Sequence, residues 1–187
     1  MSSNSDKVWT VLSMLEWGTG YLEEKDVDSP RLSMEWLLAH LLNIRRLDIY
    51  LQFDRPLSSE ELESIKPLIK RRARHEPLQY ITGSTEFLGC EMEVNPSVLI
   101  PRQETEQLAE KILENHSHQK EQSLTLLDIG TGSGCIPIAI KKRVPSWNCL
   151  GVDISDEAIK TAQRNAEINQ TEVAFITEDL FSLQQSP

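Results

Sequence analysis

The chain has 187 residues, a hydrophobic content of 39% and a formal net charge of −10 at pH 7. This length suits one large domain or two small ones, and the apolar content is ordinary for a folded protein, so we do not expect a disordered chain. Apolar stretches such as 36–42 are much shorter than the roughly 20 residues that span a bilayer. The first residues show no basic and then apolar leader. We therefore expect a cytoplasmic protein without membrane association.

The acidic balance argues against a general affinity for nucleic acid, which depends on neutralisation of phosphates by Lys and Arg. Residues 70–76 form a basic run, "KRRARHE", but on a helix such a run is more often a solvated face. The cysteines, Cys90, Cys135 and Cys149, are odd in number and lack CxxC spacing. We expect buried free thiols, with neither a disulfide framework nor a metal site.

Residues 1–77 have a helical pattern throughout. Apolar residues recur at helical spacing between 8 and 21, and a second helix is expected to start at the Ser29 cap with Pro30 in its first turn. Pro67 is expected to kink or split a third helix. The tryptophans are expected to pack in the core or between helices, namely Trp9, Trp17 and Trp36. We predict an all-helical bundle over residues 1–77.

The pattern changes after residue 77. Residues 78–101 alternate and carry glycines and an Asn95-Pro96 turn, which predicts a β-hairpin linker. Residues 102–187 then alternate between helical and extended segments, which is typical of βαβ units and a parallel sheet. The fold class predicted is α/β, with an N-terminal helical bundle, a hairpin linker, and the first half of a Rossmann-like sheet.

A glycine-rich bend interrupts the apolar stretch "LLDIGTGSGCIPIAI" at residues 126–140. Gly130, Gly132 and Gly134 follow a predicted strand and open a helix. Glycine allows positive φ and lets a ligand lie against bare backbone, while the N–H groups that open the helix point at it. A tight strand-to-helix connection alone would give the same pattern, so the bend needs support from elsewhere in the chain.

Three aspartates supply that support, because each lies at the end of a predicted strand. Asp128 precedes the bend, Asp153 lies about twenty residues on, where a carboxylate accepts both hydroxyls of a ribose, and Asp179 ends the third strand, where it could meet the exocyclic amine of an adenine. Each could instead be a helix cap. Three such positions over one glycine bend favour an adenosine pocket.

A dinucleotide and S-adenosylmethionine are the ligands that such a pocket could take. The dinucleotide fingerprint spaces its glycines GxGxxG, whereas residues 130–134 read GxGxG. Asp128 beside the bend would repel a diphosphate but suits the cationic amino-acid end of a sulfonium. S-adenosylmethionine is therefore the predicted cofactor.

The chain resembles the release factor glutamine methyltransferases of the HemK/PrmC type. The matching stretches are "EPLQYITGSTEFLG" (76–89), "VNPSVLIPRQETE" (94–106), "LLDIGTGSGCIPIAI" (126–140), "GVDIS" (151–155) and "EDLF" (178–181). The resemblance implies methylation of the glutamine nitrogen in the GGQ motif of peptide chain release factors, and so a role in translation termination. It also implies that residues 1–77 help to hold the release factor.

The resemblance also implies which residues form the site, because they stand at matching positions in the motifs. Those that would contact the cofactor are Asp128, Gly130, Thr131, Gly132, Ser133, Gly134, Asp153, Asp179 and Leu180. Arg102, Glu104 and Glu106 would shape the floor of the site. Gln103 stands where the family usually has proline, and Pro137 stands where it usually has alanine; a proline in the first helical turn is tolerable.

The family's catalytic motif, Asn-Pro-Pro-Tyr, does not occur in the printed sequence. An amide nitrogen is a poor nucleophile, and this motif would grip and aim it. We therefore expect no catalytic residue and little turnover in residues 1–187. Two other functions stay open: a non-catalytic protein that binds a release factor or the ribosome, and a nucleic-acid amino methyltransferase. The chain is expected to be a monomer, with self-association possible at the open edge of the third strand.

Overall fold

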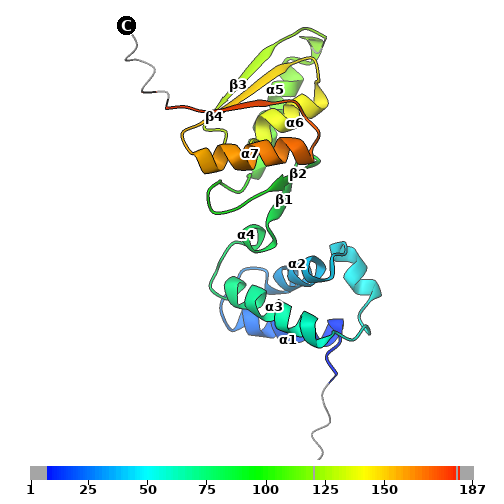
Figure 1. The fold of residues 1–187 in the computed structure, drawn as a ribbon. Helices are drawn as coiled ribbons and strands as arrows, with labels where there is room; N and C mark the ends of the chain where they lie inside the picture. Colours follow the sequence, from blue (N-terminus) through cyan, green and yellow to red (C-terminus); the bar gives the residue numbers. More distant parts are fainter. Residues whose placement is uncertain (1–7, 120, 180, 182–187) are drawn as a thin grey trace, which may run out of the picture. The chain divides into compact units, whose positions relative to one another are not determined.

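The computed structural model describes residues 8–119, 121–179 and 181. The chain divides into two compact units, a first unit of residues 1–82 and a second unit of residues 83–187 (Figure 1). The first is built from helices and the second from strands and helices, as the sequence predicts.

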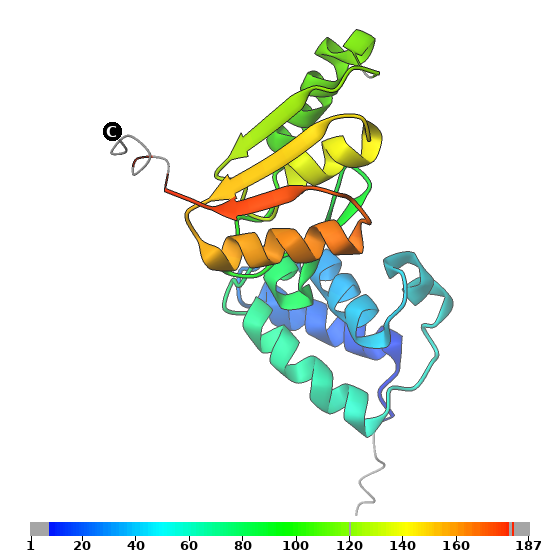
Figure 2. The same cartoon turned by 45° about the horizontal axis from the view of Figure 1, so that its top comes forward.

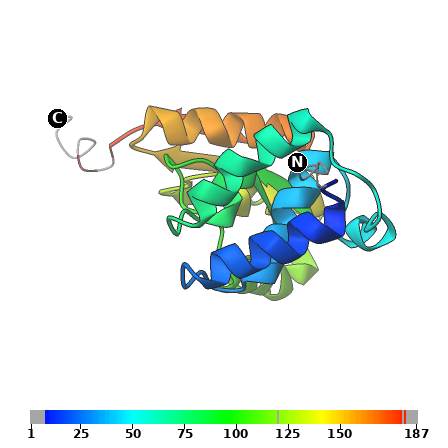
Figure 3. The same cartoon turned by 90° about the horizontal axis from the view of Figure 1, so that it is seen from below.

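The first unit is a helical bundle, which Figure 3 shows from below. Its elements are α1 (Val11–Glu23), α2 (Pro30–Leu42), the 3-10 helix η1 (Arg46–Leu51), α3 (Ser59–Arg72) and α4 (Leu78–Thr82). Capping boxes start two of them: Thr10 with Ser13 begins α1, and Ser58 with Glu61 begins α3. The two boxes satisfy backbone N–H groups that have no partner inside the helix, so they set where these helices begin.

Two expectations for the first unit are wrong in part, because Pro67 does not split its helix and two of the three tryptophans lie outside the core. Pro67 lies inside α3, which runs unbroken to Arg72; Pro67 is exposed, so water can satisfy the carbonyl that loses its donor. Trp17 and Trp36 are not core residues, since their exposed fractions are 47% and 45%. The Trp17 ring stacks on Tyr21 with centroids 5.5 Å apart.

The second unit opens with an antiparallel hairpin of β1 (Ser84–Phe87) and β2 (Cys90–Glu93). Its turn residues Leu88 and Gly89 both have positive φ, 48° and 77°, as the twist of a two-residue hairpin requires. A hairpin is thus present within the predicted range 78–101, but residues 78–82 form α4 instead of a strand. The hairpin packs against α6 (Cys135–Arg143) and α7 (Asp156–Ile168) of its own unit.

The rest of the second unit is a parallel sheet with its crossover helices. The elements are α5 (Gln103–Asn115), the 3-10 helix η2 (Ser117–Gln119), β3 (Thr125–Ile129), α6 (Cys135–Arg143), β4 (Asn148–Asp153), α7 (Asp156–Ile168) and β5 (Ala174–Thr177). The strand order is β3-β4-β5, and both pairs are parallel. Figure 2 shows the three strands side by side, with α7 running along them. The predicted α/β class with a partial Rossmann-like sheet is confirmed.

On one face of this sheet, the two outer strands expose apolar side chains, while Val152 of the central strand is buried. Leu127 and Ile129 of β3 are 53% and 58% exposed, and Ile176 of β5 is 46% exposed. The register pairs Ile129 with Val152 and Val152 with Ile176, so these residues form one row on the same face. The opposite face carries Phe175, which lies against Gly151 and Gly134.

None of the helices in the described part of the chain combines the length and the apolar character that crossing a bilayer requires.

Candidate functional site

The glycine bend after β3 is tied to the end of β4 by backbone hydrogen bonds. The N–H groups of Gly130 and Thr131 both donate to the carbonyl of Val152, at 2.8 and 2.9 Å. Within the bend, the N–H of Gly134 donates to the carbonyl of Thr131 at 2.9 Å. The bend is therefore a defined loop that joins two strand ends.

The three glycines of the bend have different reasons to be glycine. All have positive φ: 74° at Gly130, 54° at Gly132 and 76° at Gly134. A Cβ added at Gly130 or Gly132 would meet no atom within 4 Å, whereas one at Gly134 would lie 2.9 Å from Cζ of Phe175. Gly134 thus allows close packing of α6 on the sheet. Gly130 and Gly132 keep bare backbone beside open space, which a ligand can approach.

Asp153, the last residue of β4, joins its strand to the bend. Its Oδ2 accepts a hydrogen bond from the N–H of Gly132 at 2.9 Å, and its Oδ1 accepts one from the N–H of Ser155 at 3.0 Å. Each carboxylate oxygen has a second lone pair. The side chain is half-buried, so it is fixed in place and can still accept hydroxyl donors from a ligand.

Asp128 lies in β3, just before the bend. Its Oδ2 accepts a hydrogen bond from the hydroxyl of Thr131 at 2.7 Å. Burial raises the pKa of this carboxyl above its ordinary value, and the nearby charge of Asp153 adds to the rise, while the Thr131 hydrogen bond opposes it. A cation placed beside this carboxyl would oppose that shift.

Asp179 follows the end of β5. Because β4 and β5 are parallel, it lies at the same edge of the sheet as Asp153, which ends β4. The N–H of Glu178 donates to the carbonyl of Asp153 at 3.0 Å, which keeps these two chain segments adjacent. Oδ1 of Asp179 accepts from the N–H of Phe181 at 2.9 Å. Leu180, the other residue expected here, lies outside the described residues.

The residues expected at the site floor lie at the start of α5. Arg102 is the residue before the helix, and both it and Glu104 are exposed. Oε1 of Glu106 accepts the N–H of Leu88 at 3.0 Å. Glu106 therefore supports the turn of the hairpin, a use that the sequence did not indicate. The described hydrogen bonds and ion pairs join none of the three to the bend.

Cys135 follows the bend directly and has no reactive character. It is buried, and burial raises the pKa of its thiol to about 11, so it stays protonated at neutral pH. Cys90 and Cys149 are free and buried too, as predicted. Among the described residues, no three His, Cys, Asp or Glu side chains form a group that could hold a metal ion.

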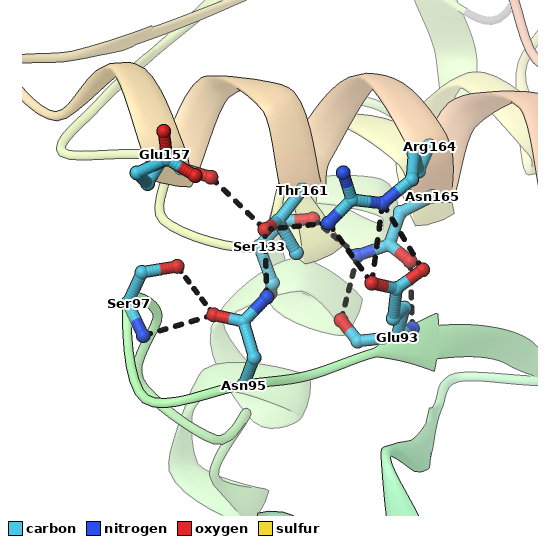
Figure 4. Close-up of polar contacts among 8 residues, drawn as sticks. All are labelled: Glu93, Asn95, Ser97, Ser133, Glu157, Thr161, Arg164 and Asn165. Carbon is cyan, nitrogen blue, oxygen red and sulfur yellow. Dashed lines mark hydrogen bonds and ion pairs between the residues drawn. The ribbon is translucent and has the colours of Figure 1, made fainter.

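Sequence reasoning missed two asparagines that hold the site together, one in α7 and one that caps its C-terminus. Asn165 is fully buried and Asn169 is 8% exposed. Asn165 bonds both to Ser133 of the bend and to Glu93 of the hairpin (Figure 4). The available signal is a pair of amides four residues apart on the buried face of an otherwise amphipathic helix, where a polar side chain needs partners.

A glycine bend after the first strand of a parallel sheet, with carboxylates at the ends of neighbouring strands, is typical of a Rossmann-like domain. Residues 13–83 match the family model described as the PrmC N-terminal domain, and residues 102–186 match that of the ribosomal protein L11 methyltransferase (PrmA). Curated release factor glutamine methyltransferases match nearly all of this chain, so it is similar to that family along its length.

Two of these relatives show the extent of the match. The release factor glutamine methyltransferase of Geobacter sulfurreducens is 45% identical over 94% of this chain and 60% of its own length. That of Chlorobaculum tepidum is 38% identical over 95% of this chain and 62% of its own length. The chain thus spans about three fifths of the length of these relatives.

A solved structure matches part of the chain less closely. The ribosomal protein L11 methylase from Lactobacillus delbrueckii subsp. bulgaricus is 33% identical with a TM-score of 0.36, over 43% of this chain and 41% of its own.

Proposed function

We propose that this chain provides the S-adenosylmethionine-binding part of an enzyme that methylates the side-chain nitrogen of the GGQ glutamine in peptide chain release factors. The observation that carries the proposal is the glycine bend with open space at Gly130 and Gly132, fixed to the carboxylate of Asp153 at 2.9 Å. The substrate is suggested by the printed names of the relatives.

The donor set suits S-adenosylmethionine. Asp153 would accept the ribose hydroxyls, and Asp128 would face the cationic amino-acid end. Asp179 and Leu180 would flank the adenine, and residues 130–134, which include Thr131 and Ser133, would cradle the ligand. When bound, the cofactor supplies an electrophilic methyl group. The residues of this chain hold it in one orientation and keep bare backbone against it.

A dinucleotide suits the same residues less well. Its pyrophosphate would have to lie beside Asp128 and Asp153, and two carboxylates near a diphosphate are repulsive. A cation is favoured there instead, because it would lie beside the carboxyl groups of Asp128 and Asp153.

The two units would have separate tasks. We propose residues 1–77 as the release factor recognition domain, residues 78–101 as the hairpin linker and residues 102–187 as the cofactor domain. Arg102, Glu104 and Glu106 are proposed as the floor of the site.

Protein rather than nucleic acid is the better substrate class for this chain. The basic run at 70–76 would be the main phosphate-binding feature, yet two of its three arginines already have intramolecular partners. Arg71 pairs with Glu76, and Arg72 donates to Ser33 at 3.0 Å and to the carbonyl of Glu76 at 3.0 Å. These contacts stabilise the first unit, and they leave these two guanidinium groups less free to bind the phosphates of a nucleic acid.

The printed residues include no Asn-Pro-Pro-Tyr. We therefore propose that residues 1–187 bind cofactor and release factor but transfer methyl groups slowly, because nothing in them orients the amide nitrogen.

The test uses a purified release factor and isotopically labelled S-adenosylmethionine. The expected result is binding of the release factor to residues 1–187, with label transfer far below that of a full-length relative under the same conditions. A release factor with Ala in place of the GGQ glutamine is the control, because it lacks the side-chain nitrogen that we propose as the methyl acceptor. Transfer to that control, or no binding of the release factor, would contradict the proposed substrate.

A further inference from the structure

Asn165 in α7 is a fully buried amide whose side chain makes three hydrogen bonds to two different segments. Its Oδ1 accepts the N–H of Glu93 at 2.6 Å, and its Nδ2 donates to the carbonyl of Glu93 at 3.0 Å. The same Nδ2 donates to the carbonyl of Ser133 at 2.9 Å. One side chain therefore joins the last residue of β2 to the middle of the glycine bend (Figure 4).

The bond to Ser133 fixes a peptide group of the bend. The carbonyl of Ser133 is held by Asn165, and the N–H of Gly134 at the other end of that peptide donates to the carbonyl of Thr131. Since both ends of the peptide group are bonded, its orientation is set. The orientation of the bend toward a ligand thus depends on Asn165.

The segment on the other side of Asn165 is held by the same helix. Arg164 pairs with the carboxylate of Glu93 at 2.9 Å, and the Asn95 amide donates to the hydroxyl of Thr161 at 3.0 Å. Residues 93–95 lead out of the hairpin into the segment that ends at the start of α5. Because this segment and the bend are both attached to α7, a shift of the segment would also move Asn165, which holds the bend.

We propose that Asn165 is a positioning residue that couples occupancy of the glycine bend to the placement of β2 and the segment after it. The inference rests on the proposed function, because it takes S-adenosylmethionine or its product as the occupant of the bend. Binding that orders the bend favours the Asn165 bonds and so holds Glu93. By linkage, holding Glu93 tightens binding at the bend by the same factor.

Asn169 offers a matched control one helical turn further on. Its Nδ2 donates to the carbonyl of Glu91 at 2.7 Å, so it ties the same strand to the same helix. Its described bonds otherwise go to Lys142 and to the carbonyl of Asn165, and none reaches the bend. Replacing either asparagine weakens the attachment of the hairpin, whereas only Asn165 holds Ser133.

The test compares Asn165→Asp with Asn169→Asp in the full chain by calorimetric titration of S-adenosylhomocysteine. Asn165→Asp keeps the acceptor for Glu93 but loses both donated bonds. We expect its dissociation constant to rise about tenfold, as loss of a buried hydrogen bond would give, and that of Asn169→Asp to change less than about twofold. Both variants should lower the melting temperature, because both weaken the attachment of the hairpin. A loss of affinity in Asn165→Asp alone would therefore identify a positioning role.

A measurement on the wild-type chain covers the case in which Asn165→Asp does not fold. Amide exchange followed by NMR should show slower exchange of the Glu93 N–H when S-adenosylhomocysteine binds. The Leu88 N–H, which Glu106 holds in the same hairpin, should be unchanged.

The outcomes separate the two proposals. Binding by the wild type with no response at Glu93, or equal affinities in both variants, would overturn the coupling alone. No binding by the wild type would overturn the proposed cofactor and the coupling together.

Discussion

The carboxylate of Asp153 accepts the N–H of Gly132 at 2.9 Å, which joins the end of β4 to the bend after β3. The two residues are 21 positions apart. The bond directs one carboxylate into the region where Gly130 and Gly132 leave open space. It gives the proposed cofactor site a geometry that the chain maintains with its own atoms.

Cofactor affinity should depend on pH through Asp128. Burial raises the pKa of this carboxyl, and a bound cation would lower it, so binding should release protons. We expect the affinity for S-adenosylmethionine to increase with pH from the ordinary carboxyl value of 3.8 up to the raised value in the free protein, and then to level off. Calorimetry between pH 4 and 7, in buffers of different ionisation enthalpy, measures this.

Asp128→Asn is the control for that dependence. It should flatten the pH profile and weaken binding about tenfold or more. The raised pKa means that ionisation of Asp128 costs stability as pH rises through the folded pKa, so the variant should be no less stable than the wild type at pH 7. An unchanged pH profile in Asp128→Asn would show that another group is responsible.

Substitutions at glycines should separate ligand binding from packing. Gly132→Ala places a Cβ in open space at φ 54°, so we expect about 1 kcal/mol of backbone strain and loss of cofactor binding. Gly151→Ala would put a Cβ 2.6 Å from Phe175 and 2.8 Å from Oγ1 of Thr131. It should cost about 2–3 kcal/mol through overpacking. Denaturant unfolding and cofactor titration measure both effects.

The double variant Gly151→Ala/Phe175→Leu tests the cause. The smaller side chain should recover part of the stability lost in Gly151→Ala, because the two positions are in contact and their effects are not additive. Additive losses would show that the clash with Phe175 is not the reason for Gly151.

Glu35 should stabilise the first unit in a pH-dependent way. It is 3% exposed, and its carboxylate accepts bonds from Arg46 at 2.6 Å and from Tyr50 at 2.5 Å. Burial alone would raise its pKa, but these bonds hold the pKa below 4.5. Its contribution is therefore present above pH 4.5 and lost as pH falls through the lower folded pKa.

Glu35→Gln should lower the free energy of unfolding by about 2 kcal/mol at pH 7, because a buried hydrogen bond to a charged group is lost. The difference should shrink in acid. The control Glu63→Gln breaks the exposed pair with Lys66 and should have no measurable effect at either pH. Equal effects of the two variants in urea unfolding would contradict the role of Glu35.

The apolar face of the sheet should cause self-association of the 187-residue chain. Leu127 and Ile129 are more than half exposed, Ile176 is 46% exposed, and they lie in adjacent rows of one face; apolar patches of this kind promote association. Light scattering should show a mass that increases with concentration. Leu127→Lys/Ile176→Lys should reduce the increase, while Leu47→Lys, an exposed position of the first unit, should not. A monomer at all concentrations would refute this expectation.

Local patterns were sufficient to predict the elements and the bend. Strand and helix periods, the hairpin turn and the GxGxG spacing are properties of consecutive residues, so they can be recognised in one chain. The positions of Asp128 and Asp153 followed because carboxyl ends of adjacent parallel strands lie at the same edge of a sheet.

Contacts between distant segments could not be predicted. Asn165 bonds to Glu93, 72 positions away, and Glu106 bonds to Leu88 in the hairpin turn; neither partner can be identified without the folded chain. The error at Pro67 has a similar origin, because whether a proline breaks a helix depends on whether the carbonyl it leaves without a donor faces solvent.

The most direct test of the account is calorimetric titration of S-adenosylmethionine into the 187-residue chain, with Asp153→Ala and the control Asp156→Ala. Asp156 is an exposed residue in the first turn of α7, three positions from Asp153. We predict that the wild type and Asp156→Ala bind alike and that Asp153→Ala binds at least about tenfold more weakly. No binding by the wild type, or equal binding by all three, would contradict the proposed site.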